Sequence, residues 1–297
     1  MKANLRYFFA PIQWLYAIAV FAVFSSSSLQ ADDGAKRKNP TSKLYVADVE
    51  GDSFINTGDK IADLTKKSVY AAEGTIIETK PDSSNALVLS NGTGISFDPD
   101  TKLEVRRFLQ EPFTPNRNDT EVEPSVSQTS AFLPRGSVGL CTSKMVAGST
   151  MNYSTPQANV TIHGRKVVIE TKGDTTTVSM LEGDATVRGD LSGGGDSIHV
   201  GQQAIITRKS PTEPPVITIQ PIPPAQREAL GDKVNMACMA RKTVYFSVAE
   251  RNPNDTYSSV FSEKTDSGEE IVPVEVLPGT IDPVVPVSPS SITRSTP

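Results

Sequence analysis

The chain has 297 residues, of which 37% are hydrophobic, enough for one large domain or two modest ones with an apolar core. Its 29 basic and 34 acidic residues give a net charge of -5, which argues against a nucleic-acid-binding protein, because such a protein needs a basic face for phosphates. Two cysteines, Cys141 and Cys238, are too few for a disulfide framework and lack the spacing of a zinc site.

The first 31 residues have the features of a secretory signal peptide. Lys2 and Arg6 precede an unbroken apolar run, Trp14 to Phe24, which is shorter than the ~20 residues of a transmembrane helix. Leu29-Gln30-Ala31 offers a small-residue cleavage site. We expect residues 1–31 to be removed on export and residues 32–43 to form a flexible start; an uncleaved N-terminal anchor is the alternative.

Export would permit one disulfide between the two cysteines, since oxidising compartments preserve such bonds. Two buried free thiols are the alternative, and we narrowly prefer it because free cysteines are often buried.

Residues 44–210 form a series of short apolar segments separated by Gly, Asn, Asp and Pro. The clearest strand candidates are Thr75 to Thr79, Ala86 to Leu89, Ile95 to Phe97 and Leu103 to Phe108. Explicit turn sequences such as Asn91-Gly92 lie between them. Short strands at close spacing predict an all-β fold rather than alternating strands and helices.

Glycines recur along these segments at an interval of 18 or 19 residues. Gly74 and Gly92 form one series, and Gly164, Gly183 and Gly201 form another, each beside a short β-rich run. Such a period indicates a β-solenoid or a rolled β-sandwich of short strands.

The remaining segments differ in composition from this β domain. Residues 111–130 are polar and proline-containing, which predicts an inserted surface loop. Six prolines within residues 211–224 predict a linker or an extended segment along a sheet edge, without ladder pairing. Residues 225–250 predict a short amphipathic helix and one further strand, and residues 251–297 predict a disordered tail.

Residues capable of chemistry are few, and each has a plain structural explanation. His163 and His199 lie beside recurring glycines and are too few to hold a metal without added carboxylates. The pairs Asp98 with Asp100 and Glu121 with Glu123 fall in loops, where solvated surface is the ordinary explanation. We therefore predict no catalytic, cofactor-binding or metal-binding residue and no cofactor. A carbohydrate-active enzyme is the less favoured alternative, since the one tryptophan, Trp14, lies in the signal peptide.

The order of the segments resembles the FecR domain, the all-β periplasmic part of bacterial iron-transport regulators. The matching stretches are "GTIIETKPDSSNALVLSNGTGISFDPDTKLEVRRF", "FLPRGSVGL", "STPQANVTIHGRKVVIE", "TTTVSMLEGDATVRG" and "IHVGQQAIITR", and the resemblance as a whole spans roughly Val69 to Arg208. His163-Gly164-Arg165 stands where the family has Arg-Gly-Thr, so only the glycine is kept and a structural corner is the favoured interpretation.

The resemblance implies a non-enzymatic exported protein that acts as a periplasmic or envelope binding or signalling module. Only thirteen residues precede the apolar run, so we expect no cytoplasmic anti-sigma domain in this polypeptide. The expected partner is a protein of the cell envelope, contacted through strand edges and the loop 111–130; a structural or adhesive protein that binds surface polysaccharide is the alternative. We expect no nucleic acid, no transmembrane helix after signal cleavage, and a periplasmic or extracellular location in a Gram-negative-type bacterium.

Overall fold

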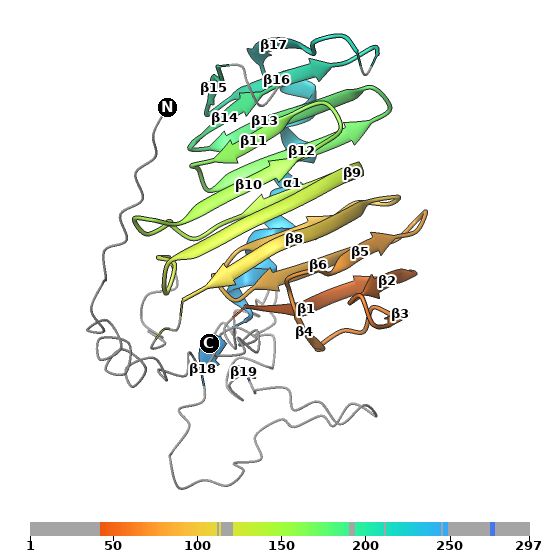
Figure 1. The fold of residues 1–297 in the computed structure, drawn as a ribbon, viewed down its shortest axis with the longest axis vertical. Helices are drawn as coiled ribbons and strands as arrows, with labels where there is room; N and C mark the ends of the chain where they lie inside the picture. Colours follow the sequence, from red (N-terminus) through yellow and green to blue (C-terminus); the bar gives the residue numbers. More distant parts are fainter. Residues whose placement is uncertain are drawn as a thin grey trace, which may run out of the picture. The chain divides into compact units, whose positions relative to one another are not determined.

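The strands of the domain stack into two facing layers with one helix behind them (Figure 1). The computed structural model describes residues 42–111, 113, 121–189, 194–210, 212–244, 246–248 and 274–276. Within these residues the chain is mostly β-strand, in a large mixed sheet that folds into two layers, sheet A and sheet B.

Sheet A contains nine strands, all paired antiparallel. In spatial order they are β4 (Val69–Ala71), β1 (Lys43–Glu50), β6 (Ser84–Leu89), β7 (Gly94–Phe97), the second part of β9 (Ser127–Cys141), β12 (Lys166–Lys172), β13 (Thr175–Glu182), β16 (Gln202–Thr207) and β17 (Val216–Pro221).

Sheet B also contains nine strands. In spatial order they are β3 (Ile61–Asp63), β2 (Ser53–Asn56), β5 (Ile76–Thr79), β8 (Lys102–Gln110), the first part of β9, β10 (Thr150–Ser154), β11 (Asn159–Ile162), β14 (Asp184–Arg188) and β15 (Asp196–His199). The β9–β10 pair is parallel and makes the sheet mixed.

Strand β9 belongs to both layers. Its residues Ser127 to Arg135 pair with β8, and its residues Gly136 to Cys141 pair with β12 on the opposite sheet. The change of sheet falls at Gly136, whose φ of 91° is in the region that favours glycine. One continuous strand therefore joins the two layers near their middle.

The hydrophobic core lies between the layers and follows the period-two alternation of the strands. It is built from inward-facing side chains of both sheets, among them Leu44, Leu87, Phe97, Leu140, Ile169 and Ile206 from sheet A and Ile55, Ile77, Leu103, Phe108, Tyr153 and Ile162 from sheet B. Alternating hairpins on two layers are a rolled β-sandwich, one of the two architectures that the sequence predicts.

Helix α1 (Pro224–Lys242) covers the outer face of sheet A. Beyond it, β18 (Phe246–Val248) pairs with β19 (Val274–Val276). The predicted all-β fold with a C-terminal helix is confirmed. The expected signal peptide lies outside the described residues, as does the expected disordered tail apart from Val274–Val276.

Three local predictions are wrong. The loop predicted for residues 111–130 ends earlier, because Ser127 to Ser130 already pair with β8 as the start of β9. Val216–Pro221, predicted to be unpaired, forms the edge strand β17, because five of its six paired residues keep their N–H groups and the proline among them, Pro221, stands at the end of the strand. Cys141 and Cys238, for which we preferred free thiols, form a disulfide.

The recurring glycines lie at corners of the hairpins. Gly74, Gly92, Gly183 and Gly201 have φ values of 80° to 94°. Gly164 lies in the bend between β11 and β12. Its φ is not in the left-handed region, and glycine is required there because neighbouring atoms leave no room for a Cβ.

Candidate functional site: the helix-flanked groove

Helix α1 approaches sheet A closely because small residues line the face beneath it. A Cβ added at Gly94 would collide with the carbonyl oxygen of Ala237, and one at Gly139 would lie 2.9 Å from the carbonyl oxygen of Lys233. Leu230, Val234 and Ala237 of the helix are buried against this face. Glycine at both positions therefore lets the helix backbone rest on the sheet.

Covalent and polar contacts fix the helix along its length. The disulfide joins Cys141, the last residue of β9, to Cys238 of the helix. The Ser96 hydroxyl donates to the Lys233 carbonyl over 2.7 Å, and the Lys233 ammonium forms an ion pair with Asp98. The helix is thus a rigid part of the domain.

The C-terminal turn of the helix is held by a buried arginine. Arg241 donates to the Thr142 carbonyl over 3.4 Å and to the Ser143 hydroxyl over 2.6 Å. Burial lowers the pKa of its guanidinium. These bonds fix the helix end that borders the groove.

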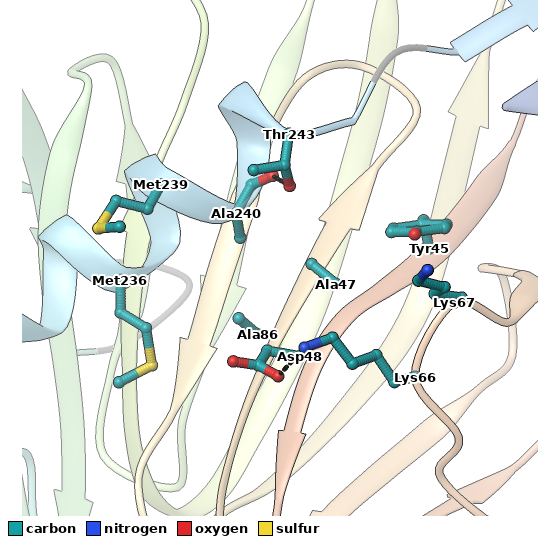
Figure 2. A pocket seen from close by; sticks show the side chains of 10 residues that line it. All are labelled: Tyr45, Ala47, Asp48, Lys66, Lys67, Ala86, Met236, Met239, Ala240 and Thr243. Carbon is teal, nitrogen blue, oxygen red and sulfur yellow. Dashed lines mark hydrogen bonds and ion pairs between the residues drawn. The ribbon is translucent and has the colours of Figure 1, made fainter. Parts of the chain in front are cut away.

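A groove of about 210 Å³ lies between this end of α1 and strand β1 (Figure 2). Met236, Met239, Ala240 and Thr243 of the helix form one wall; Tyr45, Ala47, Asp48, Lys66, Lys67 and Ala86 complete the lining. In Figure 2 the two methionine side chains and the lysine side chains lie on opposite sides of the alanines.

The groove combines an apolar floor with a charged rim. The ammonium of Lys66 forms an ion pair with the Asp48 carboxylate at 2.7 Å. Lys67 is the other positively charged residue in the lining. Burial raises the pKa of the Tyr45 phenol, partly offset by the charge of Lys66, so this ring is neutral at physiological pH. Methionine is flexible and polarisable, and surfaces rich in it suit peptide partners.

The outer face of sheet B is a second, chemically different surface. Five uncharged polar residues face one another directly across adjacent strands: Ser130, Asn152, Thr161, Thr186 and Ser197. The Thr161 hydroxyl donates to the Asn152 amide oxygen over 2.9 Å. At about 4.8 Å between strands, the row extends roughly 19 Å.

The two histidines lie near each other at the end of this face but do not converge. The backbone N–H of His163 donates to the carbonyl of Asp184 over 3.0 Å, and Asp184 pairs with His199. One strand therefore separates the histidines, a distance of about 10 Å between their backbones. Within the part of the chain that the structure describes, no group of three His, Cys, Asp or Glu residues has the arrangement of a metal site.

The four loop carboxylates have different environments. Asp98 forms an ion pair with Lys233, and Glu121 forms one with Arg165. Asp100 is exposed, and its backbone φ is 54°. Glu123 is buried, which contradicts the solvated surface expected for it. Its carboxylate accepts hydrogen bonds from the Ser127 hydroxyl and the Val146 N–H, and burial raises its pKa.

Sequence reasoning did not find the groove, although part of the signal was present. The apolar stripe of the predicted helix runs through Leu230, Val234 and Ala237, and Met236 and Met239 lie off it. Apolar residues on the solvent side of an amphipathic helix indicate a contact surface. The opposite wall comes from residues about 170 positions away in the sequence, which no local pattern connects with the helix.

The fold places the chain among two-layer β domains in which a helix covers one sheet. Residues 75–186 match the family model described as FecR protein, so the chain carries a FecR domain. FecR domains are periplasmic, the family is in general non-enzymatic, and the disulfide of this chain is consistent with the cell envelope.

Two solved structures of a candidate anti-sigma factor from Parabacteroides distasonis ATCC 8503, at 2.50 and 1.65 Å resolution, are similar to part of the chain. They are 15% and 16% identical to it, with a TM-score of 0.37 in each case, and each match covers 52% of this chain. The chain spans 62% of the length of those structures. No curated protein matches the sequence significantly.

Among the described residues, no helix has the length and apolar content needed to cross a bilayer.

Proposed function

We propose that this protein is an exported, non-enzymatic binding module of the cell envelope, with a role in signalling, and that the groove beside α1 receives a protein partner. The observation that carries the proposal is the exposure of two methionines on a helix that a disulfide and buried polar contacts hold in place. Met236 is 41% exposed and Met239 is 56% exposed. Because the wall is already ordered, binding costs little conformational entropy in the helix.

Cross-linking in envelope extracts tests the proposal. Met236 and Met239 are both replaced by glutamate in the full chain, and Asn235→Glu, at an exposed position of the same helix, is the matched control. We expect the double variant to lose at least about tenfold of the cross-linked partner, since ~1.4 kcal/mol corresponds to that factor. The Asn235→Glu control should capture as much cross-linked partner as the wild type, and both variants should retain the wild-type melting temperature. Failure to capture any protein, or equal capture by the double variant and the wild type, would contradict the proposal.

The polar row on sheet B favours a second candidate function, the binding of envelope polysaccharide. Amides and hydroxyls in register supply donors and acceptors suited to sugar hydroxyls. Co-sedimentation with purified cell-wall polysaccharide, compared between wild type and an Asn152→Ala, Thr161→Ala double variant, tests it. Lys172→Ala, at an exposed position of sheet A, is the control. Equal polysaccharide binding by all three proteins would show that the polar row is not the binding surface.

A further inference from the structure

Among the described residues, strand β17 is an open sheet edge with little protection against pairing. It contains Val216, Ile217, Thr218, Ile219 and Gln220 before Pro221, with no charged side chain. Natural sheet edges are ordinarily blocked by charges, bulges or very short strands. At the other described edges, β3 and β4 have three residues each and β15 begins with Asp196.

Exposed apolar side chains gather at this end of the sandwich. Val216 is 66% exposed and Ile219 is 37% exposed, and Val200, in the turn between β15 and β16, is 64% exposed. In Figure 1 this end is where β15, β16 and β17 lie together. The two isoleucines of β17 face the core side, because they pair with Ile206 and Ala204 of β16.

The backbone register shows which groups of β17 have no partner within the part of the chain that the structure describes. Ile222 donates its N–H to the Gly201 carbonyl over 2.8 Å. Bonding alternates along an antiparallel pair, so Gln220, Thr218 and Val216 also bond to β16, and Ile217, Ile219 and Pro221 point their backbone groups away from it. Proline stands at an outward position, where its missing N–H breaks no bond.

We propose that β17 pairs antiparallel with β17 of a second copy, about a twofold axis through Thr218. This register places Ile217 opposite Ile219 of the other copy, and the same pair occurs again on the other side of the axis. The outward N–H and C=O groups of these residues then form four hydrogen bonds between the copies.

The flanking prolines select this register. Pro215 of one copy lies opposite Pro221 of the other at both ends, where neither residue can donate, so the ladder ends there. A second copy fits better than an unrelated strand, because the free groups and the apolar side chains complement themselves about one residue. So short a ladder buries far less than the ~1,600 Å² of a standard interface, so the dimer is weak and concentration-dependent.

Cysteine cross-linking tests the register directly. In this register Thr218 of one copy lies opposite Thr218 of the other, at a non-hydrogen-bonded position. The two Cα atoms are then about 4.5 Å apart, within the range that a disulfide spans. In the full chain, Thr218→Cys should give a covalent dimer on mild oxidation at least about tenfold faster than Val216→Cys. The two copies of residue 216 are offset by four residues, roughly 14 Å.

Sedimentation of the full chain provides the second readout. The wild type should shift from monomer towards dimer as concentration rises. Ile219→Pro, which removes an outward N–H together with a partly exposed side chain, should remain monomeric, and Ile219→Ala, which shortens the side chain but keeps the N–H, is its control for stability. Val200→Lys, outside the strand, should still dimerise. A wild type that is monomeric at all concentrations, equal cross-linking of both cysteine variants, or an Ile219→Pro protein that dimerises like the wild type would overturn the proposal. A protein that stays monomeric and pairs β17 only with a peptide of different sequence would also overturn the proposal.

Discussion

Replacing Gly164 by alanine should destabilise the domain, although the backbone at Gly164 is not in the left-handed region. A Cβ at this position would lie 2.6 Å from the Glu182 carbonyl oxygen and 2.7 Å from the Asp184 nitrogen, and it would collide with the methyl of Met180. The methionine can move, but the two backbone atoms belong to a fixed corner. The N–H groups on either side of Gly164 bond across it, at 3.0 Å to the Asp184 carbonyl and at 2.8 Å to the Glu182 carbonyl.

Two opposing effects determine the size of this change. Forcing an extra methyl group into a packed site costs ~1–3 kcal/mol, and the fixed backbone places Gly164→Ala near the upper value. Loss of chain entropy in the unfolded state returns ~0.4–1 kcal/mol. The steric effect prevails, and the free energy of unfolding should fall by about 2 kcal/mol. At ~2–4 °C per kcal/mol, the melting temperature should fall by roughly 4–8 °C.

Thermal melts followed by circular dichroism measure this difference. His163→Ala is the matched control at the neighbouring residue, because its side chain is exposed and its removal should change stability by less than about 0.5 kcal/mol. Gly164→Val should lower the melting temperature more than Gly164→Ala does. The reasoning fails if Gly164→Ala melts within about 1 °C of the wild type, or if His163→Ala loses as much stability as Gly164→Ala.

Reduction of the Cys141–Cys238 bond, which closes a loop of 97 residues, should lower the free energy of unfolding by ~2–4 kcal/mol, and an unchanged melting temperature in dithiothreitol would contradict this. Because burial raises the pKa of Glu123, the folded state binds a proton more readily than the unfolded chain, so stability should fall as pH rises from about 4 through that raised pKa. Glu123→Gln should flatten this part of the urea-midpoint profile, and an identical slope in the variant would refute the assignment. The buried hydroxyl of Tyr153 has no hydrogen-bond partner among the described residues, so Tyr153→Phe should raise stability by about 1 kcal/mol; a loss of that size would reveal a partner.

The sequence predicted strands and corners well because both are local. The runs around Ile77 and Leu103 alternate between core and outer face, those around Leu87 and Ile95 are short and buried on both faces, and turn residues mark the ends of all four, so each strand was found within one to two residues. The helix was found for the same reason, from the spacing of its buried side.

Properties that depend on distant partners were not predictable. The environment of Glu123 is set by Val146 and Ser127, and nothing beside it in the sequence indicates burial. The disulfide required knowing that the helix crosses the end of β9. Strand β17 was missed because proline content was read as a barrier to pairing, whereas the register places Pro221 on the outward side.

The path of β9 has a consequence for where the domain can be cut. The family match, residues 75–186, takes in β5 to β13, ends within β14, and leaves out β1, β16 and the helix. A fragment with those limits would uncover β6 on one side and β13 on the other, and would separate Cys141 from its partner cysteine. Since β9 couples both sheets, such losses would not stay local. The smallest independently folding unit should therefore extend from β1 through α1, well beyond the segment that identifies the family.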